Sequence, residues 1–289
     1  MYGPLVITYL FLGGAAAGGM FVMSAWSLFF FRKGAINAIP LRRAQAFNQL
    51  RARMYPLCFL LLAFAIVSLF WDLERPDRVL LILLRPHVTP ITFGAWSLTI
   101  ESVLALALIA SAFGNQVIRR WQRTIELLCC VCSIAVMAYT GVFLASTASV
   151  AFWNTPWLAP LFVCSSLSSG LSIMLLVDYF VPDQSILLNA AKPLQVFHLV
   201  VLAFEAAFIA LFTLSAFRNP AALSSCSVLA SADVLPVATI GVLGFGIFVP
   251  ASLETYSLLC RGNRVIPVSD VICLCGSLLL RYCVVICGT

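Results

Sequence analysis

Residues 4–31 read PLVITYLFLGGAAAGGMFVMSAWSLFFF, a stretch without a charged side chain. A helix needs about 20 apolar residues to cross a bilayer, and lipid offers no partner for a free backbone N–H or C=O. Further apolar stretches follow at approximately 54–71, 91–113, 124–147, 157–181, 194–217, 234–259 and 266–286. The sequence therefore predicts an all-α polytopic membrane protein, a single integral membrane domain over residues 1–289 formed by a bundle of about eight transmembrane helices.

The composition of the 289-residue chain agrees with this prediction. Apolar residues make up 62% and charged residues only 10%, and the mean hydropathy is +1.05. A soluble protein of this composition would aggregate. The net charge of +6 comes mostly from basic residues in alternate loops, so it indicates a membrane orientation and no nucleic-acid partner.

The basic residues predict which way the bundle faces, because Lys and Arg in short loops remain on the cytoplasmic side. Twelve of the 17 lie in the first, third, fifth and seventh loops, whereas four lie in the even loops. We therefore expect both termini outside. The N-terminus lacks a basic n-region and a cleavage site, so the first span is expected to stay in the membrane.

Ligands for a bound metal are few in the sequence. The eleven cysteines mostly stand singly on apolar helices, whereas an iron–sulfur cluster needs four converging thiolates. The two histidines, His87 in the second loop and His198 near the start of the sixth span, lie roughly a bilayer apart and cannot share one haem iron. No other group of metal ligands stands out, so we expect no haem and no metal in this chain.

Ionisable residues inside the spans are costly there, which makes them candidates for function. Glu101 and Glu205 lie near the middle of the third and sixth spans, Glu254 and Asp178 lie closer to the cytoplasmic side, and Arg281 lies in the last span. They either join neighbouring helices as neutral or paired groups or form a proton relay. Such a relay would be extended by Tyr139, Thr140, Ser165, Ser166, Ser168 and Ser169.

Small residues are concentrated in the first span, where Gly14 and Gly18 form a small-xxx-small pair. Such a pair lets a neighbouring helix approach closely. The same surface would also leave room for a flat ligand.

Four short blocks occur in order along the chain: YLFLGGAAAGG at 9–19, DLERPDR at 72–78, TFGAW at 92–96, and YTGV at 139–142 with PW at 156–157 and PLF at 160–162. Together they resemble the NrfD/PsrC family, the polysulfide reductase membrane subunits. The resemblance is clearest over roughly the first 170 residues, and Glu205, Pro250 with Glu254, and Arg281 extend it more loosely.

This resemblance implies a haem-free subunit of the bacterial or archaeal cytoplasmic membrane. Such a subunit passes electrons between menaquinone or ubiquinone and a peripheral iron–sulfur (4Fe–4S ferredoxin-like) subunit, which joins a molybdopterin catalytic subunit of the dimethyl sulfoxide reductase class. The implied quinone pocket lies near the outer face among the first helices. Its expected quinone contacts are Tyr139, Tyr9, Thr140, Asp72 and Arg75, and the expected catalytic groups are Tyr139, Glu101 and Glu205.

Some family members carry Asn or His early in the first span, where this chain has only Thr8 and Tyr9 as polar groups. The second loop, from Asp72 to His87, is the most polar outer segment and is expected to dock a soluble partner, with residues 79–84 as an interfacial helix. One competing hypothesis is a proton- or ion-translocating subunit or secondary transporter, with Glu101, Glu205 and Glu254 lining its path. A purely structural anchor is the third.

Overall fold

The structure, a computed structural model, describes residues 4–31, 41–72, 89–147, 150–180, 184–259 and 267–288. Within these ranges the chain is helical, and no strand occurs in them. Eight helical segments are long and apolar enough to cross a membrane. The predicted all-α bundle with eight spans is therefore confirmed.

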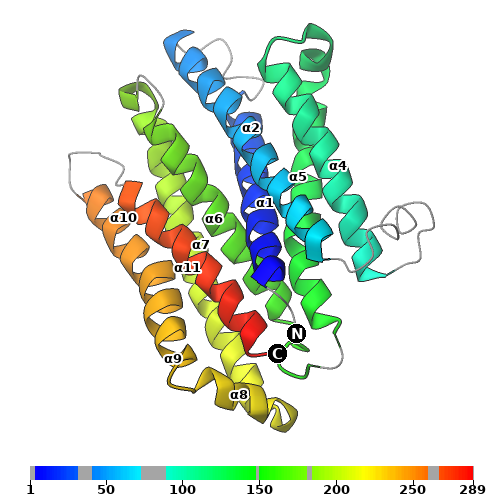
Figure 1. Ribbon diagram of the computed structural model, residues 1–289. Coiled ribbons are helices and arrows are strands. Elements are labelled where there is room, and N and C mark those ends of the chain that lie inside the picture. Colours follow the sequence, from blue (N-terminus) through cyan, green and yellow to red (C-terminus); the bar gives the residue numbers. More distant parts are fainter. Residues whose placement is uncertain are drawn as a thin grey trace.

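The spans run alternately up and down in one bundle (Figure 1). Seven of them are single helices: α1 (Pro4–Phe30), α2 (Leu41–Asp72), α4 (Pro90–Ala112), α5 (Gln116–Ala145), α6 (Leu158–Tyr179), α7 (Gln184–Arg218) and α11 (Pro267–Ile286). The remaining span joins α9 (Val234–Pro236), the π-helix η3 (Val237–Phe248) and α10 (Val249–Leu259). Between α7 and α9 the chain forms the short helices η2 (Pro220–Ala222) and α8 (Leu223–Leu229).

Three helices begin well before the apolar stretches that predict them. The sequence predicts spans from 54, 124 and 194, whereas α2 begins at Leu41, α5 at Gln116 and α7 at Gln184. Hydropathy detects only the part of a helix that lies in hydrocarbon, but helical hydrogen bonds are satisfied within the segment and continue into water as well. The predicted span start at 194 agrees with the apolar span from Pro193, whereas the starts at 54 and 124 lie later than the apolar spans from Ala44 and Ile118.

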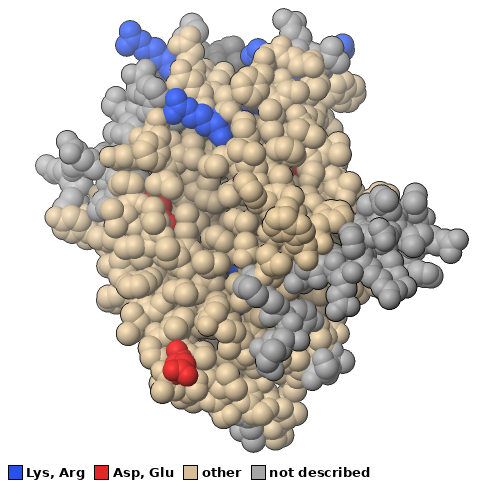
Figure 2. Space-filling view, viewed as in Figure 1, with Lys and Arg blue, Asp and Glu red and all other residues tan. Residues whose placement is uncertain are grey.

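The two ends of the bundle differ in charge. The end where α1 finishes and α2 begins, here called the basic end, carries the exposed side chains of Arg42, Arg53, Arg119, Arg120 and Arg123. Arginine side chains, drawn blue, lie at this upper end in the space-filling view (Figure 2). The opposite end, here called the termini end, holds both chain termini (Figure 1). The side of the membrane that each end faces stays a prediction.

Helix α1 lies in the middle of the bundle and packs against α2, α5, α6 and α11. Its contact with α6 is unusually close. A Cβ atom placed on Gly18 would overlap the backbone carbonyl of Ser166, and one placed on Gly170 would overlap the backbone of Gly18. The small-xxx-small pair thus permits direct backbone contact between helices, as such pairs do in membranes.

This contact predicts a difference between two glycines of α1. Gly18→Ala forces α1 and α6 apart, and overpacking of this kind costs about 1–3 kcal/mol. The melting temperature should then fall by roughly 2–4 °C for each kcal/mol. Thermal unfolding of the purified chain in detergent measures the change.

Gly13→Ala is the matched control, because its Cβ would lie 3.8 Å from the Cβ of Ala65, an ordinary contact. The control should melt at or above the wild-type temperature, since alanine favours a helix over glycine. Equal melting temperatures for the two variants would contradict the packing argument.

Candidate functional site

Two tyrosines expected to contact a quinone lie together near the termini end. Tyr139 of α5 and Tyr9 of α1 are buried, and their side chains form a hydrogen bond. Tyr139 lies six residues before the end of α5, roughly 9 Å along the helix. The fold therefore joins the first and fourth of the sequence blocks at one point.

Gly94 of the TFGAW block leaves space for the ring of Tyr139. A Cβ atom on Gly94 of α4 would overlap the ring of Tyr139, so only glycine lets the phenol lie against the α4 backbone. Phe143 borders the same ring, with a centroid separation of 6.0 Å. The phenols thus sit between α1, α4 and α5 in largely apolar surroundings.

The other expected quinone contacts do not join this pair. The Thr140 hydroxyl donates its hydrogen to the carbonyl of Met137 at 2.8 Å in its own helix. It therefore has no hydrogen left to donate to a quinone. Asp72 ends α2, and its side chain is not described. Arg75, His87 and the rest of the expected docking loop, with the interfacial helix at 79–84, lie outside the described residues.

Glu101 is enclosed between α4 and α5. The hydroxyl of Ser133 donates to Glu101 Oε1 at 2.7 Å, while Oε2 has no hydrogen-bond partner among the described residues. Ser133 lies six residues before Tyr139 on the same helix. Glu101 therefore occupies the interface that also holds Tyr139, nearer the middle of the bundle.

Arg281 of α11 is fully buried and connects three helices. Its guanidinium donates to the carbonyl of Leu10 at 3.1 Å, to the hydroxyl of Ser166 at 2.9 Å and to the hydroxyl of Ser277 at 2.7 Å. A Cβ atom on Gly14 would lie 2.7 Å from Arg281 Nη2. The glycine-rich surface of α1 therefore makes room for this cation as well as for a neighbouring helix.

Neutral groups make all the direct hydrogen bonds of Arg281 that the structure describes. Its charge is also attracted by Glu205 of α7, which lies against the hydroxyls of Ser165 and Ser168. Ser165 in turn lies 2.9 Å from the hydroxyl of Ser277. The acid and the cation thus share a layer of serines.

The serine layer continues toward the basic end through His198. The hydroxyl of Ser168 lies 3.1 Å from His198 Nε2, and His198 Nδ1 bonds Glu254 Oε1 at 2.6 Å. A continuous polar chain, defined here as Glu254, His198, Ser168, Glu205, Ser165, Ser277 and Arg281, therefore runs through the buried centre of the bundle. Asp270, beside its basic end, and Arg281 lie eleven residues apart on α11, which corresponds to roughly 16 Å.

Asp270 completes a group of three residues that the sequence does not reveal. His198, Glu254 and Asp270 offer ligand atoms within 4.8 Å of one another, and all three residues are buried. Both carboxylate oxygens of Asp270 lack a hydrogen-bond partner among the described residues. Two carboxylates and an imidazole are groups that can hold a divalent cation or share protons. The three come from α7, α10 and α11, so their spacing along the chain carries no recognisable ligand pattern.

Glu101 and Glu205, expected to serve one function, lie in different interfaces. Glu101 lies between α4 and α5 beside Ser133, whereas Glu205 faces the serines of α6 and Arg281 of α11. The described structure therefore separates a phenol site at the termini end from the polar chain.

Comparison with known proteins finds one match over the whole chain. A family model described as polysulphide reductase, NrfD, matches residues 1–289. No curated protein matches the chain.

The hydrogen bonds of Arg281 predict a stability difference between two arginines. Arg281→Lys replaces a planar fork of donors by a single ammonium, which cannot reach α1, α6 and α11 together. Losing one or two charged hydrogen bonds should reduce the free energy of unfolding by about 2–4 kcal/mol. Arg218→Lys, at the exposed end of α7, should change it little. Thermal unfolding in detergent compares the two, and similar losses would argue against the central role of Arg281.

Proposed function

The chain belongs to the polysulphide reductase NrfD family of oxidoreductase membrane subunits, and we propose that it exchanges electrons with a membrane quinone beside Tyr139 and Tyr9. The observation that carries this proposal is the meeting of the two phenols against Gly94. Three of the four family-like sequence blocks supply these residues. A site assembled from the blocks that mark the family is the strongest candidate for its shared function.

The residues around the phenols fit a quinone head group by their chemistry. A quinone is flat and apolar with two carbonyl acceptors, so it needs an apolar site with one or two hydrogen-bond donors. When bound, menaquinone or ubiquinone supplies two-electron, two-proton redox chemistry. Tyr139 would donate to a carbonyl, and Tyr9 would hold the Tyr139 phenol in place. Glu101, farther along the same interface, would accept or return a proton through Ser133.

The proposed electron partner is an iron–sulfur subunit of the 4Fe–4S ferredoxin type, attached to a molybdopterin catalytic subunit. The phenol pair lies near one end of the bundle, where a soluble partner can approach. Quinone chemistry in this chain and substrate chemistry in the partner would then be separated. This arrangement needs no metal bound by the membrane subunit itself.

A second candidate function, proton translocation, is favoured by the polar chain. Buried acids joined through hydroxyls and an imidazole provide hydrogen-bonded positions along which protons move. The polar chain from Glu254 to Arg281 runs inside the protein from the half of the bundle nearer the basic end to the half nearer the termini end. The structural alternative is that these groups only join α6, α7, α10 and α11.

The quinone proposal predicts weaker quinone binding in Tyr139→Phe. The variant keeps the ring packed on Gly94 and removes one hydroxyl, so the apparent KM for the quinone should rise about 3- to 10-fold. Turnover of the complex purified from native membranes, measured against quinone concentration, tests this. Tyr282→Phe, a half-exposed phenol of α11 near the same end, should leave the KM unchanged. Wild-type kinetics in Tyr139→Phe would favour a structural anchor instead.

The translocation proposal predicts that Glu205→Gln uncouples proton movement from electron transfer. Glutamine keeps the hydrogen bonds to the serine layer but cannot release a proton, so proton transport should fall at least about tenfold. A pH-sensitive dye inside liposomes that hold the whole complex measures transport, with quinone turnover followed in parallel. Asp233→Asn, an exposed acid at the termini end, is the control. Unchanged transport in Glu205→Gln would make the polar chain a structural link.

A further inference from the structure

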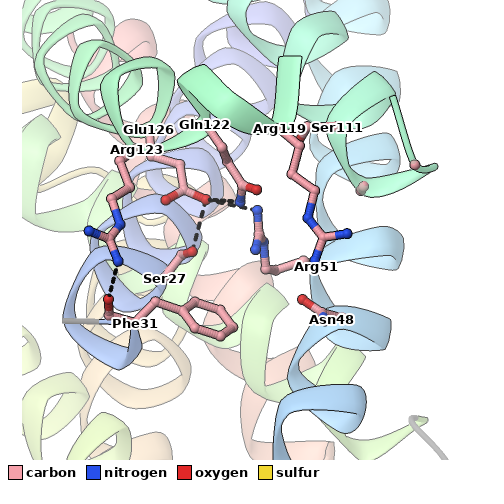
Figure 3. A pocket seen from close by; sticks show the side chains of 11 residues that line it. Ser27, Phe31, Asn48, Arg51, Ser111, Arg119, Gln122, Arg123 and Glu126 are labelled. Atoms are coloured by element: carbon pink, nitrogen blue, oxygen red, sulfur yellow. Dashed lines mark hydrogen bonds and ion pairs between the residues drawn. The ribbon is translucent and has the colours of Figure 1, made fainter. Parts of the chain in front are cut away.

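A cavity of about 310 Å³ lies at the basic end, between α1, α2, α5 and the turn from α4 to α5. Its polar lining consists of Ser27, Asn48, Arg51, Ser111, Arg119, Gln122, Arg123 and Glu126. The guanidinium groups of Arg51 and Arg119 point into it (Figure 3). The cavity lies at the opposite end of the bundle from Tyr139 and Tyr9, so it is separate from the proposed quinone site.

The cations that line this cavity outnumber the acid that faces them. Glu126 is the one acid among the described residues of the lining, and its Oε1 accepts from Ser27 at 2.8 Å, Arg51 at 2.9 Å and Gln122 at 2.7 Å. Arg123 donates instead to the carbonyl of Phe31 at 2.8 Å. Three arginines against one carboxylate leave an excess of positive charge beside the cavity.

Part of this positive charge has no partner within the described structure. Arg51 is 6% exposed, and its Nε has no hydrogen-bond partner there. Arg119 also forms no hydrogen bond or ion pair through its side chain with the described residues. A buried donor left without an acceptor is costly, so Arg51 Nε favours an acceptor from outside the chain, and the exposed Arg119 adds positive charge beside it.

We propose that this cavity binds a phosphate group, supplied by the head group of an anionic phospholipid. Arginine guanidinium groups match phosphate oxygens in pairs of parallel hydrogen bonds. A phospholipid phosphate has two unesterified oxygens that can accept from two guanidinium groups, and its single negative charge would offset part of the excess of two positive charges. Basic pockets between transmembrane helices are known binding sites for anionic head groups.

The surroundings of the cavity favour lipid over free phosphate as the source. Trp121 of α5 is 62% exposed and Phe113, in the adjoining turn, is 73% exposed. An exposed tryptophan of this kind is typical of the depth of lipid head groups. Farther along α5, Leu128 and Val131 are also exposed and offer an apolar surface for an acyl chain. Free phosphate has no apolar part that could contact these side chains.

The test uses the purified full-length chain, stripped of lipid in detergent and titrated while its melting temperature is recorded. The probes are phosphatidylglycerol, phosphatidylcholine and inorganic phosphate. Phosphatidylglycerol should raise the melting temperature, whereas phosphatidylcholine and inorganic phosphate should not. Arg119→Gln should raise the half-saturating concentration of phosphatidylglycerol about tenfold or more, because it removes charged hydrogen bonds to the phosphate.

Arg120→Gln is the matched control, because Arg120 is the neighbouring exposed arginine and does not line the cavity. It should keep the wild-type half-saturating concentration. Equal stabilisation by inorganic phosphate, lost in Arg119→Gln, would overturn the lipid source and assign free phosphate. Equal effects of the two substitutions, or no stabilisation by phosphatidylglycerol, would overturn the site itself.

Discussion

Burial of the Arg281 guanidinium is the constraint on which the packing of this bundle depends. A permanent positive charge inside hydrocarbon is tolerated only when its donors are satisfied by the protein. Here a carbonyl of α1, hydroxyls of α6 and a hydroxyl of α11 satisfy them. The absence of a side chain at Gly14 leaves space for the cation. The small residues of α1 therefore serve both charge burial and helix packing.

The two ends of the bundle carry different chemistry. The termini end holds two phenols in apolar surroundings, suited to a neutral flat ligand, while the basic end holds exposed arginines and a cavity with excess positive charge. The polar chain from Glu254 to Arg281 lies between them. Such separation lets uncharged and charged ligands approach one membrane protein from different levels of the bilayer.

Most of the fold follows from the sequence, because hydrocarbon forces every spanning backbone to be helical and about 20 apolar residues long. The polar first turns of α2 and the π-helix η3 do not follow, since hydropathy carries no signal for either. At the candidate sites, the blocks around Tyr9, Gly94 and Tyr139 could be found in the sequence because each is short and local, while their part in quinone binding stays a prediction. The group of His198, Glu254 and Asp270 could not be predicted, since helix rotation and crossing determine which buried acids meet.

The bond from Arg281 to Leu10 also has a consequence in time, because its partners are separated by 271 positions in the chain. At about 5–20 residues per second, a ribosome makes the arginine roughly 15–50 s after the leucine. During that interval α1 is complete while its last partner does not yet exist. Helix α11 brings the cation to a carbonyl of a helix made much earlier, so this contact between α1 and α11 forms late.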